Sequence, residues 1–213
     1  MALALLLVVV GCHRGGTHTR AADSAVWTDA SAPPLTIADL ARLESGGIAE
    51  LFVEAAKLDW QGGQPQLAPL QLPRLPRRGR ATLVVRGNWP LALGDADAAA
   101  RALATALESV SRRAEDAGFA VAGWHLDLVG LPGKDGGKLA HALRRRLEPA
   151  VLLSATLPRD ALAAEGIDEV TDATDFVVSF LYGVREGEAD DPAAWDFQRV
   201  HAATKQLEEL DEP

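Results

Sequence analysis

Apolar residues follow two alternating patterns along this chain: short continuous runs, and longer stretches with steps of three and four. The runs predict six buried strands, some of them weak, at residues 26–27, 48–54, 81–86, 121–129, 150–156 and 176–182. The clearest helical pattern spans residues 95–117, where apolar positions recur at Ala99, Leu103, Leu107, Val110 and Ala114. Shorter helices are predicted at residues 34–44, with Thr36 as the N-cap, at 136–147, after Pro158, and at 192–210.

Strands that alternate with helices indicate right-handed βαβ units and a mostly parallel sheet. We therefore expect an α/β fold of the (β/α)8 TIM-barrel type over residues 25–213. A complete barrel takes about 250 residues, so six strands predict an incomplete barrel of six βα units. An open Rossmann-like sheet is the alternative, which the lack of a Gly-x-Gly-x-x-Gly or Walker loop disfavours. Residues 59–80, rich in Pro, Gln and Gly, are expected to form a long loop.

The N-terminal residues 1–11 are apolar without exception. This run is shorter than the roughly 20 residues that span a bilayer as a helix, and it fits the apolar core of a secretory signal peptide. It ends in Val9-Val10-Gly11-Cys12, which resembles the lipobox of bacterial lipoproteins. The resemblance implies a signal peptide over residues 1–11, a membrane-anchoring lipid on Cys12 and a flexible tether over residues 12–24. It also implies a place in the cell envelope, on the periplasmic or outer-membrane side. A buried or incidental cysteine is the alternative.

Charge and cysteine content narrow the functional classes. The net charge of -9 argues against a nucleic-acid partner, because such proteins cluster Lys and Arg on one face. Cys12 is the only cysteine, so neither an intramolecular disulfide nor a cysteine-based metal cluster is expected. The histidines do not cluster, and we expect no metal and no cofactor.

A family resemblance extends over most of residues 26–200. The motifs that carry it are Val26-Trp27, Leu83-Val84-Val85-Arg86-Gly87, Gly123-Trp124-His125-Leu126-Asp127, Leu153-Ser154-Ala155-Thr156-Leu157-Pro158 and Thr174-Asp175-Phe176-Val177-Val178. In order and spacing these motifs resemble a bacterial lipoprotein family of glycoside-hydrolase-like barrels with no established substrate. The resemblance implies a carbohydrate ligand. It also shows a departure, because members carry a second acidic residue two positions after the one that matches Asp127, and this chain has Val129 there.

Two carboxylates are candidates for catalysis, because chemistry in such barrels sits at the carboxyl ends of the strands. Asp127 is a lone carboxylate in an apolar strand, and burying an unpaired charge costs several kcal/mol. It therefore either faces a polar cleft or is a structural residue that accepts hydrogen bonds from the backbone or from Arg86. Glu54 ends the second strand and is the candidate partner, although the second and fourth strands are not adjacent. Glycoside hydrolysis uses two carboxylates about 5–10 Å apart.

The candidates for substrate binding lie at the same strand ends: Arg86, Asn88, Trp89, His125 and Tyr182. Arg86 and Tyr182 are expected to bind sugar hydroxyls or to pair with Asp127. The flat ring of Trp89 is expected to stack on a sugar ring. His125 is expected on the same face as Asp127, since side chains alternate along a strand.

Two functions follow from these residues. The first is a carbohydrate-active barrel in the cell envelope, either a hydrolase or a descendant of one. The alternative is a non-catalytic envelope lipoprotein that binds a glycan or a protein partner. Val129 in place of a second acid favours the alternative.

Overall fold

The fold was analysed in a computed structural model, which describes residues 6–8, 24–28, 34–48, 50–157 and 164–178. The predictions for Cys12, Tyr182, the helix after Pro158 and the helix at 192–210 lie outside these residues. The strands are β1 (Leu6–Val8), β2 (Ser24–Thr28), β3 (Glu50–Gln61), β4 (Gln64–Pro69), β5 (Gly79–Asn88), β6 (Phe119–Val129), β7 (Leu152–Thr156) and β8 (Phe176–Val178). The helices are α1 (Ile37–Ser45), α2 (Ala96–Asp116), α3 (Gly133–Arg144) and α4 (Ile167–Ala173).

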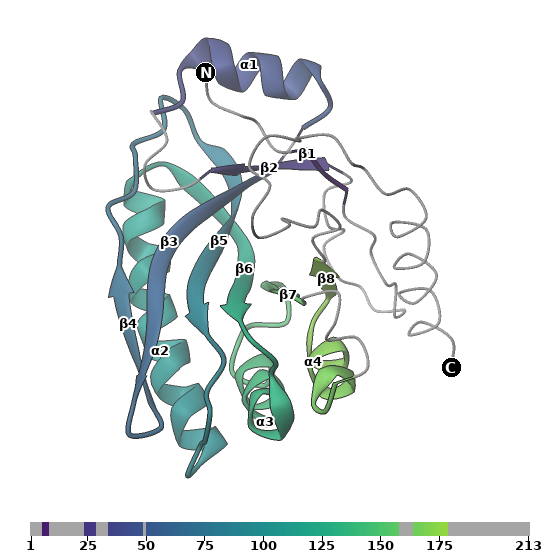
Figure 1. The fold of residues 1–213 in the computed structure, drawn as a ribbon. Coiled ribbons are helices and arrows are strands. Elements are labelled where there is room, and N and C mark those ends of the chain that lie inside the picture. The colour runs from purple at the N-terminus through teal and green to yellow at the C-terminus, as the bar shows by residue number, and fades with distance from the viewer. Residues whose placement is uncertain (1–5, 9–23, 29–33, 49, 158–163, 179–213) are drawn as a thin grey trace, which may run out of the picture.

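The strands form one curled sheet in the order β1-β2-β3-β5-β6-β7-β8 (Figure 1). All neighbours from β2 to β8 are parallel, whereas β1 is antiparallel to β2, and β4 is antiparallel to β3. The six parallel strands are the six that the sequence predicts. The prediction of an incomplete TIM-barrel-like fold is therefore confirmed. No helix within the described ranges is long and apolar enough to cross a membrane.

The long loop predicted at residues 59–80 is wrong in its first half. The strand β3 continues to Gln61, and the chain reverses at Gly62 and Gly63 into β4, with Gln61 paired to Gln64. Both glycines have positive φ, 58° and 74°, which is the backbone conformation that a two-residue hairpin turn requires. The prolines of β4 are tolerated because β4 is an edge strand, where a missing N–H can face away from the ladder. Among the described elements, β3 and β5 are therefore joined by a hairpin strand rather than by a helix.

A bulge in β3 decides which residues face the inside of the curve. The pairing with β5 shifts between Glu54 and Ala56, so Ala55 is an extra residue. Before the bulge, Glu54 is in register with Val84, and after it Lys57 is in register with Arg86. Residues in register point to the same side of a sheet. Glu54 and Lys57 therefore share the inner face although they are three positions apart.

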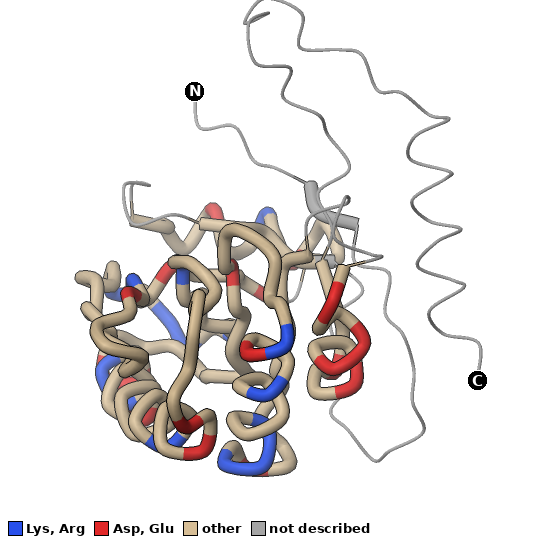
Figure 2. The backbone as a smooth tube through the Cα atoms, turned by 60° about the horizontal axis from the view of Figure 1, so that its bottom comes forward, with Lys and Arg blue, Asp and Glu red and all other residues tan. Residues whose placement is uncertain are grey.

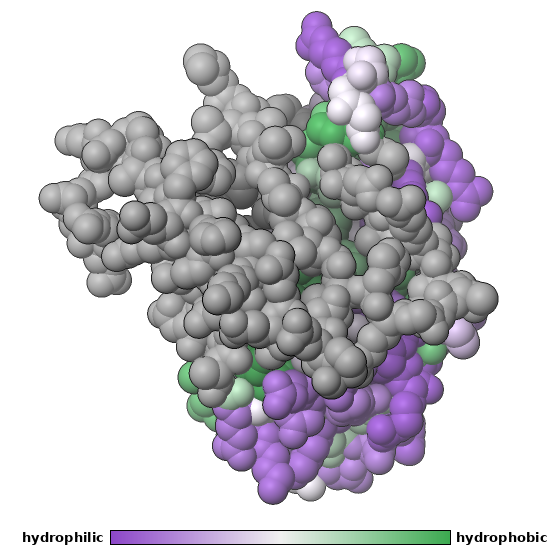
Figure 3. Space-filling view, turned by 90° about the vertical axis from the view of Figure 1, so that its right-hand side faces the viewer, coloured by the Kyte–Doolittle hydropathy of each residue, from purple (hydrophilic) through white to green (hydrophobic). Residues whose placement is uncertain are grey.

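Two apolar clusters lie on opposite sides of the sheet. The larger one packs α2 and α3 against the outer face, and it includes the fully buried Leu103, Leu107 and Leu139. Each such leucine contributes about 1.5–3 kcal/mol when it leaves water. The outer surfaces of the helices are polar, and Figure 3 shows hydrophilic side chains dominating the end that carries α3 and α4. The smaller cluster lines the inner face: Ala25, Phe52, Val84, Leu152, Phe176 and Val178.

Candidate functional site

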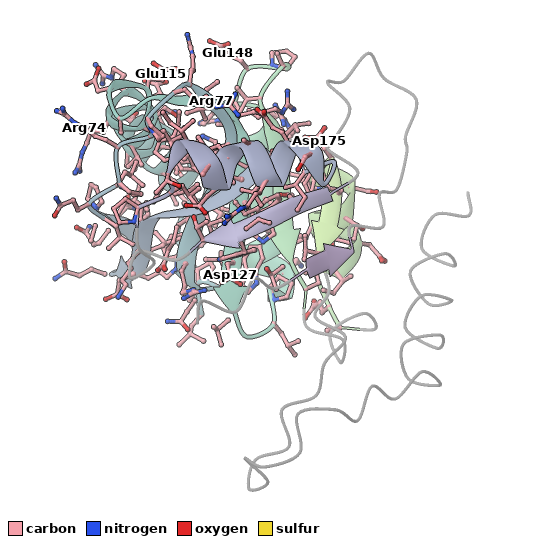
Figure 4. The ribbon with its side chains drawn as sticks, turned by 90° about the horizontal axis from the view of Figure 1, so that it is seen from above. Arg74, Arg77, Glu115, Asp127, Glu148 and Asp175 are labelled. Carbon is pink, nitrogen blue, oxygen red and sulfur yellow. The ribbon has the colours of Figure 1, made fainter. Side chains whose placement is uncertain are left out.

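Three of the predicted residues meet on the inner face of three neighbouring strands. Arg86 and Asp127 lie near the carboxyl ends of β5 and β6. Glu54 lies in the first half of β3, so the prediction that it ends its strand is wrong. Arg86 on β5 lies between Glu54 on β3 and Asp127 on β6. Its Nε donates to Asp127 Oδ2 at 3.0 Å, and its Nη1 lies 3.6 Å from Glu54 Oε2. Figure 4 shows Asp127 on the side of the sheet away from Glu115 and Glu148, which belong to the helical layer. The two carboxylates come from non-adjacent strands, as expected, and one guanidinium bridges them.

Burial differs between the cation and the two acids. The side chains of Glu54 and Asp127 are 6% and 15% exposed, whereas that of Arg86 is 46% exposed. A buried carboxylate needs a charged or hydrogen-bonding partner to offset its lost hydration. Arg86 supplies that partner to both acids and keeps part of its guanidinium open to solvent.

Two further polar residues share this face. Asn88 follows Arg86 by two positions along β5, so the two side chains point the same way, and Asn88 is exposed. Lys57 is in register with Arg86 and exposed. Sequence reasoning missed Lys57, because the predicted strand stopped at Glu54, three positions before it. We call Glu54, Lys57, Arg86, Asn88 and Asp127 the inner rim.

The end of β6 beside the inner rim is apolar. Val129 is 68% exposed and in register with Asn88. No carboxylate follows Asp127 on this strand, where the resemblance led us to look for one. The inner rim therefore has its acids only at Glu54 and Asp127, and both are in contact with Arg86.

His125 faces the same side as Asp127 but bonds to other residues. Its Nδ1 and Nε2 lie 2.8 Å from Ser154 Oγ and Thr156 Oγ1 on β7. Ser154 Oγ also donates to the Trp124 carbonyl at 3.4 Å, so Ser154 has to accept from Nδ1–H, and Nε2 accepts from the Thr156 hydroxyl. With one nitrogen donating and the other accepting, the imidazole of His125 is neutral. Its two nitrogens bond to β7 and not to Asp127.

The surroundings of His125 explain this protonation state. The ring is fully buried, and its centroid lies 5.3 Å from those of Trp27 and Phe52. Burial lowers the pKa of His125 to about 3, because the charged imidazolium loses its hydration there. His125 therefore fills the interior beneath the inner rim, and its burial is at odds with the expected role in substrate binding.

Trp89 is buried as well, which corrects the expectation that it stacks on a sugar. Its ring is 3% exposed and packs against Gly136 of α3, where an added Cβ would lie 2.9 Å from Trp89 Cε3. The half-buried Trp60 is the indole nearer to the inner rim, since its Nε1 donates to the Asn88 carbonyl at 2.8 Å. Sequence reasoning missed Trp60 because it placed that residue in a loop.

A second cluster of similar composition lies at the amino ends of the same strands. Glu50 is 3% exposed, and its carboxylate accepts from Arg80 Nε at 2.9 Å and from the Thr82 hydroxyl. We call Glu50, Arg80 and Thr82 the amino-end cluster. Sequence reasoning missed it, although Glu50 and Glu54 alternate with apolar residues in one run and so share a face.

Elsewhere on the described surface we find fewer polar side chains that are open to a ligand. A shallow groove between the outer helices is lined by residues that include Asp97, His141, Arg145 and Glu169. Its central acid, Asp97, is paired with Arg145 and Arg146 at 3.1 and 3.3 Å. Figure 2 shows mostly positive charge along α3 and only negative charge along α4. In the part of the chain that the structure covers, no three His, Cys, Asp or Glu side chains gather in a way that could hold a metal ion.

Comparisons with known proteins agree on the fold. A scan against known protein families finds no match. A search of characterised proteins by sequence finds none either. Among solved structures, the chain is similar to the spore cortex-lytic enzyme SleL of Bacillus cereus, with a TM-score of 0.54 and 14% identity. It is also similar to the chitinase ChiA74 of Bacillus thuringiensis, with a TM-score of 0.57 and 11% identity.

These two matches cover 87% and 89% of this chain but only 47% and 46% of the enzymes. The chain thus spans about half the length of each. A third match is the xylanase and α-amylase inhibitor protein XAIP-II of Scadoxus multiflorus, with a TM-score of 0.54, 14% identity, and coverage of 87% of this chain and 74% of the inhibitor. At such identities the likeness shows the fold alone, which is part of a TIM-barrel-like α/β barrel.

Proposed function

We propose that this chain binds a carbohydrate at the inner rim. The inner rim offers carboxylates, a guanidinium and an amide, which match the donors and acceptors of sugar hydroxyls, and it lies towards the carboxyl ends of β5 and β6. In barrels of this kind, that end of the sheet is where ligands bind. The fold shared with chitinases supports the same class of ligand.

Binding without hydrolysis is the function that the geometry favours, and one observation carries it. Arg86 contacts both carboxylates of the inner rim, at 3.0 Å and 3.6 Å. A glycosidase needs one acid that delivers a proton and a second that acts as base or nucleophile. Carboxylates that share one arginine serve instead as fixed acceptors. The apolar Val129 beside them offers no replacement acid.

Hydrolysis by Glu54 and Asp127 is the second candidate. The observation in its favour is that one guanidinium reaches both carboxylates, so they lie close together despite coming from non-adjacent strands. Under this alternative, Asp127→Asn abolishes turnover and leaves the melting temperature within a few degrees. Under binding alone, the unsubstituted chain releases no reducing sugar from chitin oligomers.

Calorimetric titration with chitin oligomers and with uronic acid oligomers tests the proposal. We expect saturable binding, and we expect Arg86→Ala to weaken it by about tenfold or more, which corresponds to about 1.4 kcal/mol. Arg101→Ala is the matched control, because Arg101 is exposed on α2 in the outer layer. Binding that survives Arg86→Ala unchanged, or binding of no glycan at all, rejects this site.

We also propose that a lipid on Cys12 tethers the chain to a membrane of the cell envelope. The apolar run over residues 1–11 and the lipobox-like Val9-Val10-Gly11-Cys12 support this. Cleavage before Cys12 removes β1, so β2 loses its antiparallel partner in the mature chain. The Cys12→Ser variant is expected in the soluble fraction of cells, with its N-terminal segment retained. A variant that stays in the membrane fraction contradicts the anchor.

A further inference from the structure

The outermost donors of the inner rim are two cations on adjacent strands. Lys57 and Arg86 are in register on β3 and β5, which places their backbones about 4.8 Å apart. Both side chains are exposed, whereas the acids of the rim are largely buried. A ligand that approaches from solvent therefore meets these two cations before it meets Glu54 and Asp127. It also meets the exposed Asp59, which lies two positions after Lys57 on the same face of β3.

Neither cation has all its N–H groups engaged by the residues that the structure describes. Arg86 engages Asp127 through Nε and Glu54 through Nη1, and no partner for Nη2 is found among the described residues. Lys57 forms no ion pair with any residue that the structure describes. The nearest acid along β3 is Asp59, whose Oδ1 accepts from the Trp60 backbone N–H at 2.8 Å.

From this arrangement we infer that the ligand of the inner rim is a carboxylate-bearing sugar, bound between Lys57 and Arg86. The inference rests on the proposed function and adds the class of glycan. A carboxylate accepts two parallel hydrogen bonds from a guanidinium, and an adjacent ammonium adds a charge-assisted bond. Glu54 and Asp127 act behind Arg86 as positioning residues, because they fix the plane of the guanidinium. The exposed amide of Asn88 is left for a hydroxyl of the same sugar.

The excess of acid over base in the whole chain makes this pair selective. The net charge is -9, so an anionic glycan is repelled from most of the surface. At this place two exposed cations, Lys57 and Arg86, stand beside one exposed acid, Asp59, so the local balance of exposed charge is positive. An uncharged glycan has no comparable reason to prefer Lys57.

Parallel titrations with three ligands test the inference: an oligomer of galacturonic acid, N-acetylmuramic acid, and an uncharged chitin oligomer. We expect at least one acidic sugar to bind about tenfold more tightly than the chitin oligomer. High salt should reduce that preference, because it screens exposed charges. Lys57→Gln should remove most of it, because the variant should lower the affinity for the acidic sugar about tenfold and the affinity for the chitin oligomer by much less. Lys138→Gln, at an exposed lysine on the outer side of α3, is the matched control.

The outcomes separate this inference from the proposed function. If the chitin oligomer binds as tightly as both acids, or if Lys57→Gln changes nothing, the carboxylate preference is wrong while carbohydrate binding stands. If none of the three binds, both proposals fall. Lys57 is an exposed side chain, so its substitution is expected to leave the folded state intact, and a melting curve verifies that.

Discussion

The amino-end cluster and the inner rim each pair a glutamate of β3 with an arginine of β5, but they differ in how far they are closed to solvent. At the amino end, Glu50 is buried and takes donors from both Arg80 and Thr82. At the carboxyl end, one arginine serves two acids and remains nearly half exposed. The comparison teaches that an arginine–carboxylate pair in a barrel is not by itself a site. What distinguishes the inner rim is hydrogen-bonding capacity left open to solvent.

His125 lies on the inner face between the two clusters, and its titration gives the largest predicted effect. The pKa of His125 is lowered to about 3 in the folded state and is near 6.5 in the unfolded chain. The stability that comes from keeping it neutral is therefore complete above pH 6.5 and is lost as the pH falls from 6.5 towards 3. The loss is on the order of 1 kcal/mol of unfolding free energy for each pH unit in that window.

Denaturant unfolding at several pH values measures this slope. In His125→Gln the side chain can still bond to the hydroxyls but does not titrate, so the slope attributable to His125 should vanish. If the dependence of unfolding free energy on pH is the same in His125→Gln, water reaches the interior around His125, between the amino-end cluster and the inner rim. In that case the two ends of the barrel interior are not separated by a dry core.

The matched pair Glu50→Gln and Glu54→Gln gives the next largest effect. Glu50→Gln should lower the unfolding free energy by about 2–3 kcal/mol, less than for a fully buried pair because Arg80 is partly exposed. Glu54→Gln should lower it by about 1 kcal/mol or less, because Arg86 is more exposed and keeps Asp127. Thermal and denaturant unfolding of the two variants measures the difference. Equal losses contradict the contrast between a closed and an open cluster.

For glycan affinity we expect the opposite order: Glu54→Gln should have the larger effect and Glu50→Gln the smaller one. Glu50→Gln is expected to leave the titration curve unchanged, because the amino-end cluster lies at the far end of the strands. Glu54→Gln is expected to weaken binding several-fold, since Arg86 loses one of the two contacts that fix its plane. The conservative variant Glu54→Asp, which keeps the charge, should restore part of the affinity. If Glu50→Gln weakens binding as much as Glu54→Gln does, both binding defects are explained by loss of the folded state.

Much of the fold and part of the inner rim could be predicted from the sequence, because parallel strands end at one edge of a sheet. Six apolar runs separated by helical patterns were enough to predict the incomplete barrel. Glu54, Arg86 and Asp127 were chosen as charged residues expected at strand ends, and the structure brings them together. The strand end was wrong for Glu54, because β3 continues to Gln61.

The rest depends on local backbone events that periodicity does not encode. The bulge at Ala55 moves Lys57 to the inner face, and no pattern of apolar residues marks it. The hairpin at Gly62 and Gly63 was signalled by the two glycines, but the surrounding Pro and Gln residues indicated a loop. The burial of Trp89 depends on the glycine at position 136 of a distant helix, which a strand-by-strand interpretation cannot detect.

Asn88→Ala tests the edge of the inner rim and gives the smallest predicted effect. The amide is exposed, and the bond from Trp60 is made to the Asn88 backbone carbonyl, which the substitution keeps. The unfolding free energy should therefore stay within about 0.5 kcal/mol. Glycan affinity should fall by about two- to fivefold, the range expected for one neutral hydrogen bond. Gln61→Ala, at an exposed position of the hairpin, is the control. An affinity that does not change confines the ligand to Lys57 and Arg86 and excludes a hydroxyl contact at Asn88.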